Sequence, residues 1–425
     1  VRDESGKRRL EYPQGTVLYE TTGVIEDIRF SPDGRRIAFI DHPLATDSRG
    51  SVAVIDVASR KKATISAGWL DVDAAAWNPS GSEVWFTATK SGVDRALYAA
   101  SLSGKVRTIV TIPGSLSLQD IDAKGRVLLT RLTQRTRIRA LAPGETKERE
   151  LSWFDWSMVR AISPDGKKLL FDESGEGGGA KYAAFLRGTD GSPPVKLADG
   201  AAAAISADGK SVLAVEMADL PRLKRIPVGA GDAQTVSTDS VVVARAQYTN
   251  DGKYLLIRGY RRGESARWWV MPAAGGAPVP IDKSEDAGRW IANSPDGKLV
   301  AFAMKGGKIL IQPLRGVGSA AAGPALDGAK AREIAFADTT KIRAPIQWSE
   351  DGRSLFAVEP GIGTPMRVFK IDVLTGVETL WKDVQPPDVT GVAAIPELVI
   401  APNGKAYAYS FTQYLGDLYL ATGLK

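Results

Sequence analysis

The sequence predicts an all-β protein that forms a single closed β-propeller of about nine four-stranded blades. A short turn motif recurs along the whole chain, and each copy is followed by further apolar segments of strand length. A helical spacing of apolar residues is absent outside a doubtful stretch at 316–338. Four strands in a repeat of 40 to 50 residues are typical of a propeller blade.

The recurring motif is an apolar residue, Ser or Asn, a small residue, Asp-Gly and a basic residue, followed by a hydrophobic strand. Clear copies are FSPDGRRIAFI from Phe30, ISPDGKKLLFD from Ile162 and YTNDGKYLLIR from Tyr248. Asp-Gly between apolar runs favours a tight hairpin because both residues tolerate positive φ. The turn glycines, spaced 41 to 55 residues apart, are Gly34, Gly81, Gly125, Gly166, Gly209, Gly252, Gly297, Gly352 and Gly404.

The number of blades and the closure of the ring follow from the ends of this series. Eight blades are the alternative, because the copy from Ile121 is degenerate and the seventh repeat is enlarged. The ninth copy supplies three strands, and Thr16–Glu20 has strand character. We expect this N-terminal strand to join the last blade, so that no sheet edge stays open. The predicted organisation is a polar segment at 1–15 and a propeller at 16–425.

Composition excludes several classes of site. The chain has 425 residues, a net charge of +6, no cysteine and one histidine, His42. Disulfides, thiolate metal sites, a cysteine nucleophile and a zinc site built from several imidazoles are therefore excluded. No long basic run points to nucleic acid, and no apolar run reaches the roughly 18 residues that span a bilayer. We expect a monomer that does not span a membrane.

The repeats over 17–425 resemble the TolB-like family of bacterial propellers, the PD40 type of WD40-like repeat. A narrower resemblance is to the propeller region of acidobacterial serine/threonine protein kinases. It is carried by VLYETTG, FDESGEGGGAKYAAFLRGTDGSP and AYAYSFTQYLGDLYLATGLK, at 17–23, 171–193 and 406–425. That resemblance implies a sensing or binding role and an extracytoplasmic, periplasmic location in a bacterium, with the cytoplasm as the alternative. The chain itself has neither kinase motifs nor a G-x-S-x-G elbow.

The binding site is predicted on one face of the propeller. Loops between the second and third strands and loops between blades share that face, and they mix acids, arginines and glycines, as in 41–50 and 172–182. Such loops commonly carry function. The predicted ligand-binding residues are Arg49, Arg131, Arg160, Glu176, Tyr182, Arg289 and Trp290.

Acidic residues of inner strands and loops are candidates for a cation site in the channel. Oxygen ligands suit calcium, and histidine with carboxylates suits zinc. A bound divalent cation would polarise an ester or phosphoryl oxygen, with His42 and Asp41 as the catalytic pair. The alternative is that the acids pair with arginines across the channel and His42 caps a loop. The predicted metal ligands are Glu26, Asp73, Asp120 and Glu173.

The leading functional hypothesis is a non-catalytic binding or sensor propeller that takes a small molecule or a protein at its loop face. A metal-assisted hydrolase of esters, lactones or phosphate esters, with its site at the channel mouth, is the alternative. A scaffold for protein partners is the third reading. Whether the chain is an enzyme stays open at this point, because no complete catalytic motif is present.

Overall fold

The computed structural model describes residues 1–4, 7–43, 48–91, 94–175, 177–217, 221–262, 264–281, 284, 287–304, 307–314, 331–336, 342–361 and 363–424. Every helix or strand assigned in these ranges is a β-strand, so the all-β prediction is confirmed. Within them, no helix is long and apolar enough to cross a membrane.

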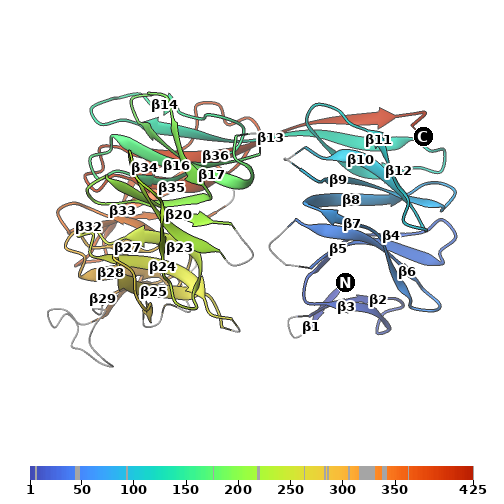
Figure 1. The fold of residues 1–425 in the computed structure, drawn as a ribbon, viewed down its shortest axis with the longest axis horizontal. Helices are drawn as coiled ribbons and strands as arrows, with labels where there is room; N and C mark the ends of the chain where they lie inside the picture. Colours follow the sequence, from blue (N-terminus) through green and yellow to red (C-terminus); the bar gives the residue numbers. More distant parts are fainter. Residues whose placement is uncertain are drawn as a thin grey trace. The chain divides into compact units, whose positions relative to one another are not determined.

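The chain divides into two compact units (Figure 1). Unit 1 consists of Val1–Gln134 and Tyr414–Lys425, and unit 2 consists of Arg135–Gln413. The division falls inside two long strands, β13 (Val127–Leu141) and β36 (Tyr407–Ala421). Part of the polar N-terminal segment at 1–15 is a strand, β2 (Lys7–Glu11).

Unit 1 contains four antiparallel sheets that follow one another along the chain. The orders are β1-β2-β3, β4-β5-β6-β7 and β11-β10-β9-β8, and in the last sheet β13 lies between β12 and β36. The remaining strands of this unit are β1 (Arg2–Glu4), β3 (Val17–Thr21), β4 (Val24–Phe30), β5 (Arg36–His42), β6 (Gly50–Asp56), β7 (Lys62–Trp69), β8 (Asp71–Trp77), β9 (Glu83–Thr89), β10 (Ala96–Ser101), β11 (Val106–Val110) and β12 (Ser115–Ile121).

Unit 2 contains six sheets. Five take four consecutive strands each, from β15 to β34, and in the sixth the pairings give the order β14-β13-β36-β35. Their strands are β14 (Arg149–Glu150), β15 (Ser157–Ile162), β16 (Lys168–Gly175), β17 (Gly179–Gly188), β18 (Val195–Asp199), β19 (Ala201–Ile205), β20 (Ser211–Glu216), β21 (Arg222–Pro227), β22 (Gln234–Val236), β23 (Val242–Tyr248), β24 (Tyr254–Tyr260), β25 (Arg267–Pro272), β26 (Val279–Pro280), β27 (Ala292–Asn293), β28 (Leu299–Ala303), β29 (Ile309–Pro313), β30 (Arg332–Ile334), β31 (Ala344–Trp348), β32 (Ser354–Val358), β33 (Met366–Asp372), β34 (Glu378–Val384) and β35 (Val392–Ile400).

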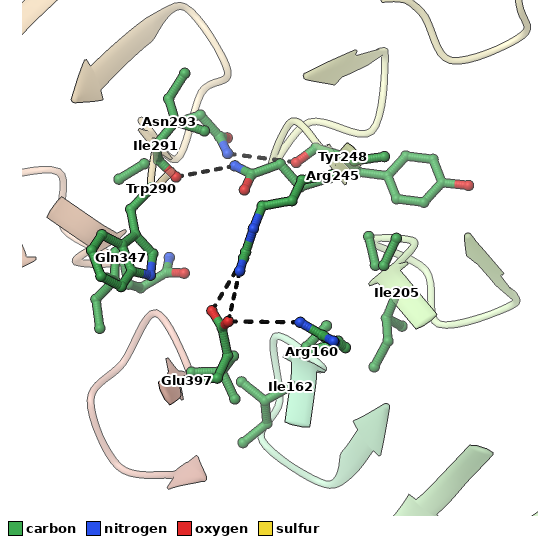
Figure 2. Close-up of a pocket in the computed structure, with 18 of the residues that line it drawn as sticks. Arg160, Ile162, Ile205, Arg245, Tyr248, Trp290, Ile291, Asn293, Gln347 and Glu397 are labelled. Atoms are coloured by element: carbon green, nitrogen blue, oxygen red, sulfur yellow. Dashed lines mark hydrogen bonds and ion pairs between the residues drawn. The ribbon is translucent and has the colours of Figure 1, made fainter. Parts of the chain in front are cut away.

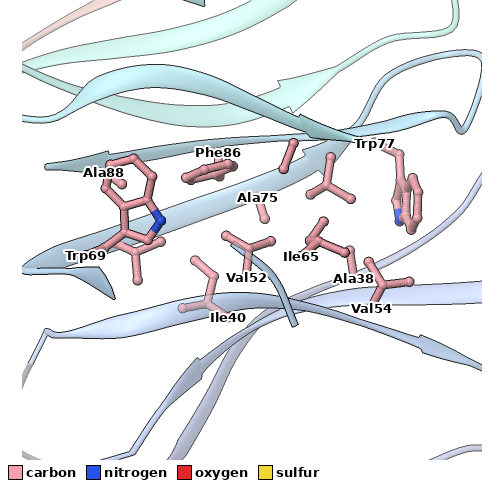
Figure 3. Close-up of a cluster of buried hydrophobic side chains, with 13 residues drawn as sticks. Ala38, Ile40, Val52, Val54, Ile65, Trp69, Ala75, Trp77, Phe86 and Ala88 are labelled. Atoms are coloured by element: carbon pink, nitrogen blue, oxygen red, sulfur yellow. The ribbon is translucent and has the colours of Figure 1, made fainter. Parts of the chain in front are cut away.

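Apolar clusters between successive sheets form the core. In unit 1, Trp69 and Phe86 belong to the cluster between the β4–β7 and β8–β11 sheets (Figure 3). In unit 2 each sheet shares a buried cluster with the next, and Ile138 and Val159 belong to the one that joins the sixth sheet to the first. Each sheet thereby buries both faces, which a single sheet cannot do alone.

The repeated turns have the predicted geometry. Gly34, Gly166 and Gly252 have φ values of 70°, 74° and 72°, the left-handed region that glycine adopts without steric cost. In the copy at Ser163, the hydroxyl donates to Asp165 over 2.6 Å, and Asp165 accepts the amide N–H of Lys167 over 3.0 Å. The aspartate of the motif therefore stabilises the turn as well as permitting it.

The prediction that Thr16–Glu20 joins the last blade is wrong. Strand β3 pairs with β2, and β36 pairs with β13 instead. Leu18 of β3 is buried with Leu10 and Ile25, so this strand has an apolar partner close by in sequence. A short loop costs less closure entropy than pairing across hundreds of residues. The predicted count of nine blades in one ring is not confirmed, because β13 and β36 place the third and ninth repeats in one sheet.

A polar clasp, formed by Glu148, Tyr407, Tyr409 and Arg139, joins strands from the beginning and the end of unit 2. Glu148, just before β14, accepts hydrogen bonds from the Tyr407 hydroxyl over 2.5 Å and the Tyr409 hydroxyl over 2.9 Å, both on β36. Arg139 of β13 approaches the same carboxylate at 3.2 Å. Burial, followed by the charge of Glu148, raises the pKa of Tyr409, so its hydroxyl remains a donor.

Removing one donor of this clasp should destabilise unit 2. We expect Tyr409→Phe to lower the free energy of unfolding by about 1–2 kcal/mol, because the substitution deletes a buried hydrogen bond to a charged acceptor and keeps the ring. Urea unfolding followed by tryptophan fluorescence measures the change. The matched control is Tyr419→Phe, since Tyr419 lies on the same strand and is 45% exposed. Equal losses in both variants would contradict the role of the clasp.

Candidate functional site

Unit 2 contains a cavity of about 380 Å³ that is lined by one edge strand of each of its six sheets, namely β15, β19, β23, β27, β31 and β35 (Figure 2). Residues separated by more than two hundred positions in the sequence therefore meet here. The lining combines aliphatic side chains with a few charged and amide groups, which is the composition usual for ligand pockets. Its polar members include Arg160, Arg245, Gln247, Arg289, Gln347 and Glu397.

Glu397 of β35 is the centre of an ion-pair network in this cavity. Arg245 of β23 donates to both carboxylate oxygens of Glu397, with N–O distances of 2.9 and 3.3 Å. Arg160 of β15 lies 3.8 Å from Glu397 and donates to Asp172 over 2.7 Å. The side chains of Glu397 and Asp172 are 7% and 2% exposed, so both negative charges depend on these arginines.

The pairing keeps Arg160 charged despite its surroundings. Burial alone would lower the pKa of Arg160, but the charge of Asp172 and the hydrogen bond to it outweigh that effect and leave the pKa raised. Because opposite charges attract more strongly where water is excluded, the pair fixes the orientation of the guanidinium. Three strands, β15, β16 and β35, are held in relation to one another by this contact.

Arg289 extends from the segment before β27, and its guanidinium lies 4.0 Å from the centre of the Trp290 ring. It donates one hydrogen bond, over 2.8 Å, to the backbone oxygen of Pro396. Partial burial lowers the pKa of Arg289. The charge of Glu397 opposes this effect, and the positive charges of Arg245 and Arg160 add to it. Stacking on the indole holds the guanidinium flat at the cavity wall.

The amide side chains of the cavity join neighbouring strands. Gln247 of β23 donates to the backbone oxygen of Ile291 over 3.3 Å, and Asn293 of β27 accepts the N–H of Asn250 over 2.7 Å. These contacts connect the sheet of β23 with the sheet of β27. They hold the cavity wall together at a place where β27 is only two residues long.

Three of the predicted ligand-binding residues line this cavity, namely Arg160, Arg289 and Trp290. Tyr182 lies close enough to Arg160 to contribute to the raised pKa of that arginine. The backbone φ of Tyr182 is 60°. The other predicted ligand residues are elsewhere: Arg49 and Arg131 belong to unit 1, and Glu176 lies outside the described residues.

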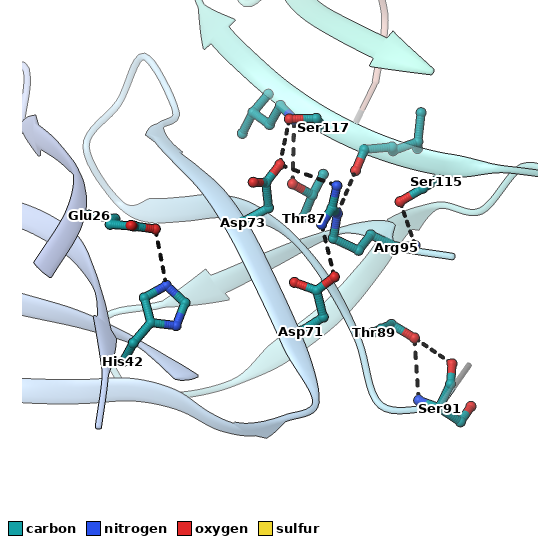
Figure 4. A network of polar contacts seen from close by, with 12 residues as sticks. Glu26, His42, Asp71, Asp73, Thr87, Thr89, Ser91, Arg95, Ser115 and Ser117 are labelled. Carbon is teal, nitrogen blue, oxygen red and sulfur yellow. Dashed lines mark hydrogen bonds and ion pairs between the residues drawn. The ribbon is translucent and has the colours of Figure 1, made fainter. Parts of the chain in front are cut away.

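The predicted catalytic pair lies in unit 1 and is engaged in local contacts. His42 is 5% exposed, with Nδ1 3.1 Å from the backbone oxygen of Arg49 and Nε2 3.4 Å from Glu26 (Figure 4). Asp41 accepts a hydrogen bond from the Tyr19 hydroxyl over 2.9 Å and forms a short ion pair with Lys62. His42 thus contacts a loop backbone, and Asp41 pairs with a lysine of its own sheet and not with an arginine across a channel.

The predicted metal ligands do not form one group. Asp73 of β8 accepts a hydrogen bond from Ser117 over 2.6 Å and lies 3.6 Å from Arg95 (Figure 4). Asp120 accepts the N–H of the next residue over 2.9 Å. Glu173 belongs to unit 2. Over the described ranges, no three residues of the types His, Asp and Glu are grouped so that they could hold a metal ion.

Sequence analysis missed Arg245 and Glu397, the two residues with the strongest contact in the cavity. Arg289 lies eight residues before its turn glycine, Gly297, whereas Arg245 and Glu397 lie seven residues before Gly252 and Gly404. The pairing registers shift by a bulge in β15, β23, β31 and β35. A bulge re-aims the following side chains, so one fixed offset does not find the inward residues of every repeat.

No protein-family model matches this chain, and no curated protein sequence matches it. Among solved structures, TolB from Acinetobacter baumannii is 18% identical with a TM-score of 0.29, covering 66% of this chain and 61% of that chain. A putative TolB from Agrobacterium tumefaciens is 17% identical with a TM-score of 0.32, covering 86% and 98%. An oligogalacturonate lyase from Vibrio parahaemolyticus is 14% identical with a TM-score of 0.39, covering 64% and 77%. Since these TM-scores lie below 0.5, the propeller-like architecture rests on the strand pairing and buried clusters of the chain itself.

Neutralising Glu397 should destabilise unit 2. We expect Glu397→Gln to lower the free energy of unfolding by about 1–3 kcal/mol, because two guanidiniums in a sheltered cavity lose their shared counter-charge. Urea unfolding is the measurement, with Glu150→Gln as the control, since that side chain is 43% exposed. A wild-type midpoint for Glu397→Gln would contradict the network.

Glu173 provides a pH-dependent test. Burial raises its pKa, its Oε1 forms a short hydrogen bond with Ser157, and its Oε2 is buried without a described partner. A raised folded-state pKa means that the folded protein binds more protons than the unfolded one between the ordinary value of 4.5 and the raised value. Stability therefore falls as the pH rises through this window. Glu173→Gln should flatten that part of the curve of Tm against pH, and Glu150→Gln should leave it in place.

Proposed function

We propose that this chain is a non-catalytic binding protein whose ligand site is the cavity of unit 2, with the six sheets of that unit acting as blades of a closed propeller. The observation that carries the proposal is that one edge strand of every sheet in the unit lines the same cavity. A pocket built in this way is held open by six independent cores and does not depend on one mobile loop.

The chemistry of the lining supports recognition of a ligand. Two ion pairs lie in or beside the cavity, Arg245 with Glu397 and Arg160 with Asp172. The side-chain amides of Gln247 and Asn293 form hydrogen bonds with backbone groups. Aliphatic residues and Trp290 supply the apolar contact area that binds the body of a small molecule. A role in sensing, a protein partner at the loop face and an extracytoplasmic location remain parts of the proposal that rest on the sequence resemblance alone.

Filling the cavity should abolish binding. Ala244 lines it and is exposed to it, so Ala244→Trp adds an indole to a space of about 380 Å³. A panel of small carboxylates, sugars, amines and peptides, screened by thermal shift, should contain compounds that raise the Tm of the wild type, because ligands that bind only the folded state stabilise it. We expect Ala244→Trp to lose these shifts.

The matched control is Ala277→Trp, which adds the same side chain at an exposed position of unit 2 outside the cavity. It should bind as the wild type does. Shifts that persist in Ala244→Trp, or a panel that shifts nothing, would count against the cavity as the ligand site.

A further inference from the structure

The cavity of unit 2 has more positive than negative charge in its immediate surroundings. Arg160, Arg245 and Arg289 line it, and Arg258 lies opposite Arg245 on the neighbouring strand β24. Among the described residues, two carboxylates pair with this group, Asp172 and Glu397. Arginine stays protonated in proteins, so the cluster has positive charge that its own carboxylates do not balance.

Two of these guanidiniums retain donors without acceptors in the described structure. Arg289 is exposed to solvent at the cavity wall. It donates to the backbone oxygen of Pro396 and stacks on Trp290, and no carboxylate of the described residues forms an ion pair with it. Nη1 of Arg258 is buried and has no hydrogen-bond partner. A buried donor left unsatisfied costs about 1–3 kcal/mol, which applies to Arg258. Arg289 instead presents its guanidinium at the wall of the cavity, where a ligand can reach it.

Burial and neighbouring charge act together on both residues. Burial, followed by the charge of Arg245, lowers the pKa of Arg258, and partial burial lowers the pKa of Arg289. The Arg258 guanidinium is therefore held where its charge is unfavourable, whereas the charge of Glu397 partly offsets the same effect at Arg289. A negative group beside Arg289 is attracted by Arg289 itself and by the nearby charges of Arg245 and Arg160, and this attraction strengthens as water is displaced.

We propose that the cavity binds a small organic carboxylate, with the Arg289 guanidinium as the group that receives the ligand's carboxylate. The expected two-point contact between a guanidinium and a carboxylate is already present once in the cavity, where two N–H groups of Arg245 donate to the carboxylate of Glu397. The planar fork of a guanidinium matches two carboxylate oxygens. The Trp290 ring fixes the plane of Arg289, and the aliphatic wall, which includes Ile205 and Ile346, accommodates an apolar body. This inference rests on the proposed function, because it specifies the ligand of the same cavity.

The test uses phenylacetate, its neutral counterpart phenylacetamide, and phenyl phosphate, with affinities measured by calorimetry on the full chain. Phenylacetate should bind at least about tenfold more tightly than phenylacetamide, and its affinity should fall as salt is added. Arg289→Gln should weaken phenylacetate binding about tenfold or more and leave phenylacetamide binding unchanged. Arg353→Gln, at an exposed turn of unit 2, is the matched control and should bind phenylacetate as the wild type does.

The outcomes separate this inference from the proposed function. Binding of phenylacetate that is lost in Ala244→Trp but unchanged in Arg289→Gln would overturn the role of Arg289 and leave the cavity as the site. Equal affinity for phenylacetate and phenylacetamide would overturn the preference for an anion. Tighter binding of phenyl phosphate would overturn the assignment to a carboxylate. Binding that survives in Ala244→Trp would overturn the cavity itself.

Discussion

Burial of sheet faces against one another is the constraint on which the rest of this structure depends. Each four-stranded sheet has two faces rich in aliphatic residues, and a face that meets water loses about 25 cal/mol for every Å² of apolar surface left exposed. Clusters such as the one around Trp268 and Phe302 solve this by joining two consecutive sheets. In unit 2 the series returns to its starting sheet, so no face in the series lacks a neighbour.

The cavity is the geometric consequence of that arrangement. One edge strand of each of the six sheets faces a central space, and the residues around this space come from strands between β15 and β35. Apolar residues fill the spaces between sheets, whereas the cavity lining also includes charged residues. Arg160, Arg245 and Glu397 are far apart in sequence, and their ion pairs add electrostatic ties across the space that the hydrophobic cores leave empty.

The repeated turn made the sheet content, the strand order within most repeats and the hairpin geometry predictable. Asp165 and Gly166 act locally, so their effect is visible in a few residues of sequence. Thr16–Glu20 was misplaced because strand character does not specify a partner, and a neighbouring strand with Leu10 competes at lower entropic cost. The sequence singled out Arg160, Arg289 and Trp290, which line the cavity, but it placed them on the loop face of a single nine-bladed ring. Arg245 and Glu397 were not singled out, since a bulge changes which side chains point inward without changing the motif.

The two long strands have a consequence for the order in which the protein can be assembled. Residues 1–134 include β12 and the first half of β13, but the third strand of that sheet is the second half of β36, at 414–421. Unit 2 is thus an insertion between two adjacent strands of unit 1. A ribosome must synthesise all of unit 2 before unit 1 receives its last strand, so a stable nascent intermediate would contain a finished inserted domain and a host domain still one strand short.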